Sequence, residues 1–124
     1  NAAKYAGPAA VVRIAAAETD EHRIRITVED GGSGVPAESL PRLFEKFYRV
    51  PRKGEGSRRG TGIGLAVVLG LVEAMGGRVT ARASDLGGLA VDVDLPEATA
   101  VDDETAGEDQ VSIQAVRTAE RPVA

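Results

Sequence analysis

The sequence of 124 residues contains no cysteine, no tryptophan and a single histidine. The absence of cysteine excludes a disulfide scaffold and thiolate metal sites. No apolar run approaches the roughly 20 residues that a membrane-spanning helix needs, and no signal peptide is recognisable. With only two Phe and two Tyr, the core must consist of aliphatic side chains. The length predicts one domain, and a first residue that is not Met indicates a piece of a longer product, with a cytoplasmic location as the default expectation.

The net charge of −4 is concentrated at the C-terminal end. Residues 97–124 hold seven acidic and two basic residues, which leaves 12 acidic and 13 basic residues in residues 1–96. The acidic segment also lacks a periodic apolar face. We therefore expect a folded domain over 1–96 and an acidic tail over 97–124 that is disordered or loosely docked.

Eight of the 15 glycines lie between Gly31 and Gly64. Gly60-Thr61-Gly62-Ile63-Gly64-Leu65 leads directly into a helical spacing of apolar residues that ends at Gly76-Gly77. A glycine loop before a helix N-terminus suits a phosphate, because free N–H groups and the positive end of the helix dipole point out of it. A flexible linker before a helix is the alternative.

The rest of the chain shows alternating and helical apolar patterns around two further loops. The expected helices cover 1–6, 37–47 and 63–75, and the expected strands cover 11–17, 23–29, 78–84 and 89–95. The first two strands should pair antiparallel with one face buried, and Asp92 and Asp94 should make one face of the last strand wet. Residues 48–61 show no periodicity and hold five basic residues, which is typical of a functional lid.

Asp30 ends a strand and is followed by Gly32 and Gly34. These glycines let a flat ligand approach the backbone, and the carboxylate is a plausible acceptor for the exocyclic amine of adenine. A hairpin turn is the alternative for any Asp-Gly pair, but a helix rather than a strand is expected next. Neither the Walker loop nor the dinucleotide fingerprint fits the glycine motifs.

Four segments resemble the N, G1, F and G2 boxes of sensor histidine kinases, in that order: Asn1-Ala2-Ala3-Lys4-Tyr5, Asp30-Gly31-Gly32-Ser33-Gly34, Phe44-Glu45-Lys46-Phe47-Tyr48-Arg49 and Gly60-Thr61-Gly62-Ile63-Gly64-Leu65. The closing Gly87-Gly88 and Leu95-Pro96 resemble the last hairpin of the same ATP-binding domain, although Leu89 stands where many members have Thr. The resemblance covers about residues 1–96. It implies a Bergerat-type two-layer α/β sandwich, in which a mixed, mostly antiparallel sheet of four or five strands carries the helices on one face.

The resemblance also implies a role for each matching residue. Asn1 would coordinate Mg²⁺, and Lys4 and Arg49 would contact phosphates of ATP. The remaining residues would bind the nucleotide: Tyr5 beside it, Asp30 with Gly32 and Gly34 at the adenine, and Gly60, Thr61, Gly62, Ile63, Gly64 and Leu65 at the end of the lid.

The implied function is binding of ATP and Mg²⁺ for transfer of the γ-phosphoryl group to a histidine on a dimerisation domain, in the same polypeptide or on a separate chain. A response regulator would act downstream, and the fragment could be the cytoplasmic part of a membrane-bound sensor, without nucleic acid or direct membrane contact. The alternatives are a serine-protein kinase of the anti-sigma-factor type and a nucleotide-binding regulatory module without transfer. His22 precedes a strand and lacks the context of a phosphoacceptor, so a solvated turn histidine is expected.

Overall fold

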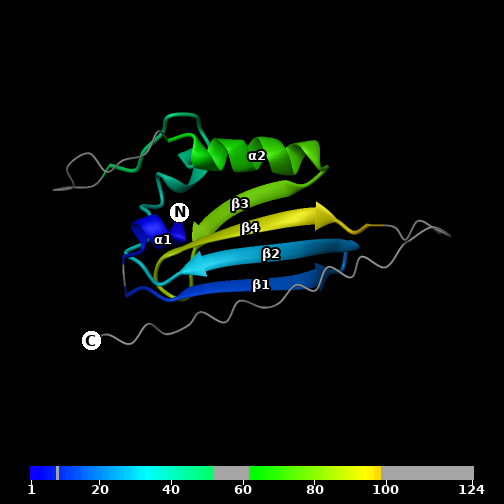
Figure 1. Ribbon diagram of the computed structural model, residues 1–124, viewed down its shortest axis with the longest axis horizontal. Helices are drawn as coiled ribbons and strands as arrows, with labels where there is room; N and C mark the ends of the chain where they lie inside the picture. Colours follow the sequence, from blue (N-terminus) through cyan, green and yellow to red (C-terminus); the bar gives the residue numbers. More distant parts are fainter. Residues whose placement is uncertain (8, 52–61, 99–124) are drawn as a thin grey trace, which may run out of the picture.

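The computed structural model describes residues 1–7, 9–51 and 62–98. Its centre is a four-stranded sheet in the order β1-β2-β4-β3 (Figure 1). The strands are β1 (Val12–Thr19), β2 (Arg23–Asp30), β3 (Arg78–Ala83) and β4 (Leu89–Pro96). All four lie within one or two residues of their predicted positions, and every pairing is antiparallel. Most of the predicted lid and nearly all of the predicted tail lie outside the described residues.

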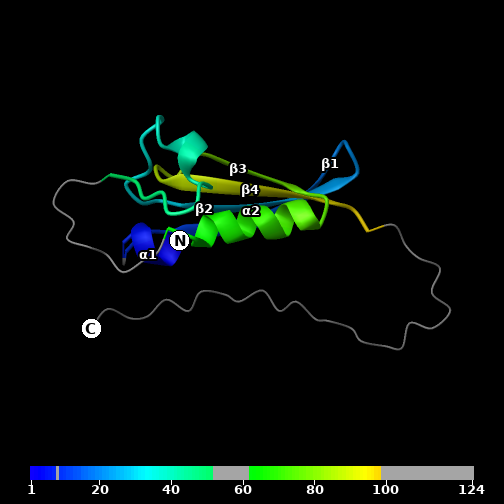
Figure 2. The same ribbon diagram turned by 90° about the horizontal axis from the view of Figure 1, so that it is seen from above.

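The helices α1 (Ala2–Tyr5) and α2 (Gly64–Ala74) lie on the same side of the sheet (Figure 2). This arrangement confirms the predicted two-layer α/β sandwich. The helix expected over 63–75 is also confirmed, and α2 packs mainly against β3. No helix in the described part of the chain is long and apolar enough to cross a membrane.

The predicted helix over 37–47 is wrong, because only a 3₁₀ turn, η1 (Leu40–Arg42), forms there. Pro41 would be the fifth residue of this helix. Proline has no backbone N–H to donate to the carbonyl of the residue four positions earlier, and its ring would clash with that carbonyl. Phe47 then adopts a positive φ of 66°, which ends any helical path. The apolar spacing of the segment therefore reflects packing of an irregular turn.

The register divides the sheet into an apolar face and a polar face. Ile26 and Val28 of β2 lie opposite Val93 and Val91 of β4 on the apolar face, which α1 and α2 flank. On the polar face, ion pairs join neighbouring strands in a ladder: Arg13–Glu29, Arg25–Asp94 and Arg82–Asp92.

The expectation that Asp92 and Asp94 are wet is wrong, because arginine side chains cover them. Asp92 is 6% exposed and Asp94 is 8% exposed. Arg25 donates to both carboxylate oxygens of Asp94 at 2.7 and 3.0 Å. Asp92 accepts from Arg82 at 2.8 Å and from the Thr27 hydroxyl at 2.7 Å.

These contacts lower the pKa of both carboxyl groups. Burial raises the pKa of Asp92, but the hydrogen bonds from Arg82 and Thr27 outweigh it. The bonded Arg25 guanidinium lowers the pKa of Asp94 against the opposing effect of burial. Because protons bind more tightly to the unfolded chain, both groups stabilise the fold above their unfolded pKa of about 4, and this contribution is lost as the pH falls through the lower folded values.

We expect the free energy of unfolding to decrease as the pH falls below about 4, and to decrease less in an Asp94→Asn variant. Urea unfolding between pH 7 and pH 2 measures both. Asp20→Asn, which changes an exposed turn residue outside the ladder, is the matched control and should keep the wild-type pH dependence. An Asp94→Asn curve parallel to the wild-type curve would contradict a role for the ladder.

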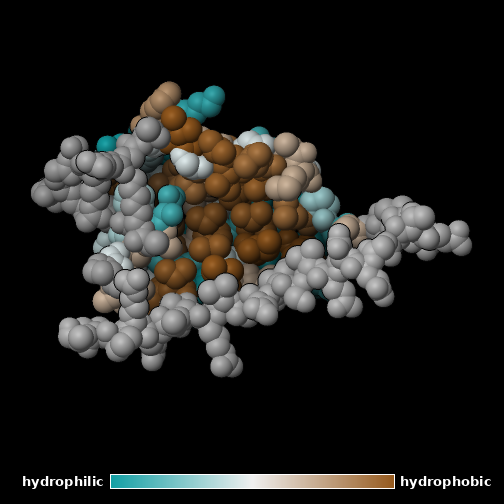
Figure 3. All heavy atoms as spheres, in the orientation of Figure 1, coloured by the Kyte–Doolittle hydropathy of each residue, from teal (hydrophilic) through white to brown (hydrophobic). Residues whose placement is uncertain are grey.

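The apolar face is only partly covered, so the buried hydrophobic core is small. Among the described residues the buried apolar side chains are Val72, Val79 and Ala90, and the register places Ala90 on the polar face, opposite Glu29 and Arg82. The expectation that one face of the first strand pair is buried is wrong for β1, where Ile14 is 70% exposed. Figure 3 shows hydrophobic side chains gathered on this side of the molecule. Among the described residues, the one long helix, α2, packs against β3 and not against the face of β1.

We expect the native chain to bind the dye ANS (1-anilinonaphthalene-8-sulfonate), because it adsorbs to exposed apolar surface. Ile14→Thr should reduce the fluorescence while shifting the melting temperature little, since threonine keeps the β-branched shape that favours a strand. Ala17→Thr, on the opposite face of β1, is the control and should leave the dye signal unchanged. Equal fluorescence in Ile14→Thr and wild type would show that another surface binds the dye.

Candidate functional site

The segments that carry the predicted site meet at one end of the sheet. There β2 ends, β4 and α2 begin, and α1 lies beside them (Figures 1 and 2). Antiparallel pairing explains why the end of β2 lies beside the start of β4, because neighbouring strands then run in opposite directions. Segments separated by up to 59 residues, such as Asp30 and Leu89, thereby come into hydrogen-bonding contact.

Asp30 lies at the centre of this end and is 8% exposed. Its Oδ1 accepts from the backbone N–H of Gly32 at 2.9 Å and of Leu89 at 3.3 Å. Its backbone carbonyl accepts from the N–H of Gly88 at 3.1 Å. Oδ1 therefore orients the carboxylate through hydrogen bonds to two separate segments.

Two glycines are required by the space around this carboxylate. A Cβ on Gly88 would overlap Oδ1 of Asp30, and a Cβ on Gly32 would lie 2.6 Å from the Cα of Ala6. Gly32 therefore packs against the end of α1. We did not predict Gly88 as a site residue, although the Gly87-Gly88 pair before a strand was a signal for it.

Gly34 also belongs to this cluster. It has a φ of 76°, and a Cβ there would lie 3.2 Å from the carbonyl oxygen of Gly87. A positive φ of this size favours glycine. The loop after Asp30 thus packs against the turn between β3 and β4, which rules out the hairpin alternative for Asp30-Gly31, since no strand follows it before η1.

Gly62 fixes the end of the second glycine motif to residues 47–48. Its carbonyl oxygen accepts from the N–H of Phe47 at 2.9 Å. Its φ is 68°, and a Cβ there would lie 2.9 Å from the backbone of Phe47 and 3.0 Å from the carbonyl oxygen of Tyr48. Phe47 and Gly62, the residues that flank the predicted lid, are therefore in contact. Gly60 and Thr61 lie outside the described residues.

The N-terminus of α2 has no side-chain cap among the described residues. Its N-cap residue Ile63 makes no side-chain cap hydrogen bond, and the first turn holds no acidic residue. The first N–H groups of an α-helix have no partner within the helix. Gly64 and Leu65 thus present donors and the positive end of the helix dipole beside Gly62.

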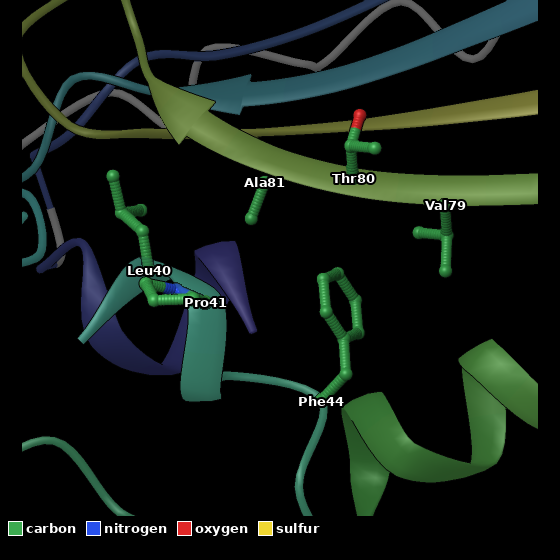
Figure 4. Close-up of a pocket in the computed structure, with 6 residues that line it drawn as sticks. All are labelled: Leu40, Pro41, Phe44, Val79, Thr80 and Ala81. Atoms are coloured by element: carbon green, nitrogen blue, oxygen red, sulfur yellow. The ribbon is translucent and has the colours of Figure 1, made fainter. Parts of the chain in front are cut away.

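The two phenylalanines of the segment differ in their roles. The ring of Phe44 points towards β3 and lines a hollow there (Figure 4) together with Leu40, Pro41, Val79, Thr80 and Ala81. Phe47 is 71% exposed, so it does not belong to the core, although its apolar spacing with Leu40, Leu43 and Phe44 is typical of a buried face. The hollow contains none of the predicted nucleotide residues, and we interpret it as the packing contact that anchors the segment before Phe47.

Four predicted residues precede or follow these loops. Asn1 is exposed and makes no side-chain cap hydrogen bond to α1, and Tyr5 is half-buried in the same helix. Arg49 is exposed and follows Tyr48. Lys4 is a residue of α1, immediately before Tyr5. The structure therefore brings Asn1, Lys4 and Tyr5 to the same end of the sheet as Asp30.

The described residues contain no group of three or more His, Asp or Glu side chains that could hold a metal ion by themselves. Asn1 is nevertheless compatible with Mg²⁺, because its amide oxygen is not used as a helix cap. Mg²⁺ in nucleotide sites keeps several waters and needs only one or two protein ligands besides phosphate oxygens.

His22 lies in the turn between β1 and β2, exposed and with a φ of 55°. This turn precedes β2, whereas Asp30 ends β2, so the two residues lie at opposite ends of an eight-residue strand. The structure confirms His22 as a solvated turn residue.

Curated proteins with similar sequences are sensor kinases. The chain is 36% identical over 96 residues to the signal transduction histidine-protein kinase BaeS of Escherichia coli K12, and 44% identical over 102 residues to the sensor histidine kinase CusS of E. coli O6:H1. Each alignment covers 77% of this chain. The chain spans about a fifth of the length of these relatives (20%).

Solved structures resemble the fold. A mycobacterial sensor histidine kinase, MprB, matches with a TM-score of 0.67 and 29% identity over 77% of this chain and 64% of that one. Full-length ShkA in complex with AMPPNP matches with a TM-score of 0.57 and 37% identity over 73% of this chain and 18% of that one. The family model of histidine kinase-, DNA gyrase B- and HSP90-like ATPases matches residues 1–99. The chain therefore belongs to this ATPase family.

Proposed function

We propose that the chain binds ATP with Mg²⁺ and presents its γ-phosphoryl group to a histidine of a two-component phosphoacceptor domain. The observation that carries the proposal is the placement of Asp30, oriented by two backbone N–H groups, at the same end of the sheet as the N-terminus of α2. Similarity to sensor histidine kinases supports the choice of acceptor. The crystallised ShkA complex supports the choice of nucleotide, since AMPPNP is an ATP analogue.

Asp30 would read the adenine. Its Oδ2 would accept from the exocyclic amine, while Gly32 and Gly34 leave room for the flat ring against the backbone. Gly88 must stay glycine for the carboxylate to keep this orientation. Leu89 contributes its backbone N–H to Asp30, so the Thr found at this position in many members of the family is not needed for that bond.

The phosphates would lie towards α2. The N–H groups of Gly64 and Leu65 would donate to phosphate oxygens, and Lys4 and Arg49 would neutralise their charge. Asn1 would hold Mg²⁺, which shields the charge of the phosphates when bound. Phosphoryl transfer depends mainly on such positioning and charge neutralisation.

The transfer itself would break the bond between the γ-phosphorus and the bridging oxygen, leave ADP, and form a bond to an imidazole nitrogen of the acceptor. His22 does not fit this role, because it lies at the other end of β2. The acceptor histidine would therefore come from a dimerisation domain in the same polypeptide or on a separate chain, and a response regulator would then take the phosphoryl group.

Asp30→Asn should weaken ATP binding about 10- to 100-fold, the range expected when a hydrogen bond to a charged group is lost. The amide oxygen can still accept from Gly32 and Leu89, but an NH₂ group then faces the adenine amine. Titration with a fluorescent ATP analogue measures the affinity, and the melting temperature verifies the fold. Asp20→Asn is the matched control. Unchanged affinity in Asp30→Asn would reject the adenine assignment.

Incubation with γ-labelled ATP and Mg²⁺ should leave this chain unlabelled and label an added histidine-bearing dimerisation domain. Acid-labile label on this chain that disappears in His22→Ala would contradict the proposal. Acid-stable label on a serine of the partner would indicate the anti-sigma-factor type of kinase. ATP binding without any transfer to partners from related sensor kinases would favour a regulatory module.

A further inference from the structure

A second charged cluster lies at the end of the sheet remote from Asp30. It consists of Arg23 and Arg25 on β2 and Arg78 on β3, which share the polar face with Asp94 of β4. We call it the arginine cluster. Arg25 holds Asp94 in a two-pronged ion pair, and the charges of Arg23 and Arg78 further lower the pKa of this carboxyl group.

The cluster carries more positive charge than Asp94 can balance. Arg23 donates from Nη2 only to carbonyl oxygens, those of Gly76 and Asp94 at 3.2 Å each, and its Nε is buried without a partner within the described residues. Arg78 is exposed and forms no ion pair there. Two further acids act on Arg25: Asp92, which already accepts from Arg82 and Thr27, and the exposed Glu21.

The chain leaves the sheet beside this cluster. Pro96, the last residue of β4, pairs with Arg23. The N–H of Glu97 donates to the carbonyl oxygen of His22 at 3.1 Å, and the Glu97 carboxylate lies 3.9 Å from His22 Nδ1. The described part of the chain ends at Ala98, one residue after this contact with the turn that precedes Arg23.

The sequence of residues 99–124 is complementary in charge. It holds six acidic residues, of which Asp102, Asp103 and Glu104 are consecutive. The four peptide steps from Ala98 to Asp102 can span up to about 14 Å when the chain is extended. Neighbouring strands are about 4.8 Å apart, so the acidic triplet can reach Arg23, Arg25 and Arg78.

We propose that the acidic segment 102–104 of this chain docks on the arginine cluster. Its carboxylates bind the guanidinium groups that Asp94 leaves uncompensated. Attachment to β4 raises the effective concentration of the segment at the cluster, so individually weak surface ion pairs can be populated. The contact is electrostatic and must weaken as salt is added. It is independent of the proposed function, because no nucleotide residue takes part.

Because the chain has no cysteine, a single Ala106→Cys substitution provides a unique site for a nitroxide spin label on the full chain. We expect paramagnetic broadening of the amide signals of Arg23, Arg25 and Arg78, and little broadening near Gly34 and Gly62. The broadening should disappear in 1 M NaCl, where the Debye length is about 3 Å.

Two variants test the partners separately. Arg23→Gln/Arg78→Gln in the folded domain should abolish the broadening. Asp102→Asn/Asp103→Asn/Glu104→Gln should do the same without changing a residue of the sheet, which keeps the test valid if the first variant folds poorly. Arg42→Gln/Lys46→Gln, which removes the same charge from exposed positions on the 40–47 segment, is the matched control and should keep the broadening.

Three results would overturn the proposal. The first is broadening that persists in 1 M NaCl or in the Asp102/Asp103/Glu104 variant. The second is broadening at residues 49–51 and Gly62 instead, which would place the segment on the basic lid. The third is broadening that arises between molecules. It would appear when spin-labelled chains without ¹⁵N are mixed with ¹⁵N-labelled chains that carry no spin label, and it would make the occupant the tail of a second copy.

Discussion

The hydrogen bonds of Asp30 are the constraint on which the candidate site depends. They tie the end of β2 to the loop at Gly32 and to the first residue of β4 at Leu89, and the Asp30 carbonyl adds the N–H of Gly88. A buried carboxylate without such donors would be costly. With them, one carboxylate oxygen is bound to both the loop and β4, so the same residue supports the loop and fixes the orientation of its own carboxylate.

The glycines of the site act through close approach as much as through backbone freedom. Gly88 has no room for a Cβ because the Asp30 carboxylate occupies that space, and Gly62 combines a positive φ with contact to Phe47 and Tyr48. The Gly62 contact joins two of the sequence boxes, and the Gly88 contact joins the box at Asp30 to the last hairpin. Segments that lie far apart in the sequence are therefore in contact in the fold.

The two faces of the sheet stabilise the fold in different ways. The polar face consists of arginine–carboxylate pairs across strands, which hold β1, β2, β3 and β4 in register without a second apolar layer. The apolar face carries the helices at the site but leaves β1 open. The small buried core and the exposed Ile14 follow from this division, whereas the arginine cluster follows from the uneven number of charges on the polar face.

Local patterns in the sequence determined the four strands, the helix after Gly64, the loop after Asp30 and the family resemblance, because alternation, helical spacing and glycine positions act over a few residues. Only the tertiary structure decided that Asp92 and Asp94 are covered, that Phe47 is exposed, that 37–47 is not helical and that Gly88 contacts Asp30. These outcomes depend on neighbours from other strands and on chain geometry at Pro41. Burial and close contact are properties of pairs of segments, and no single segment specifies its partner.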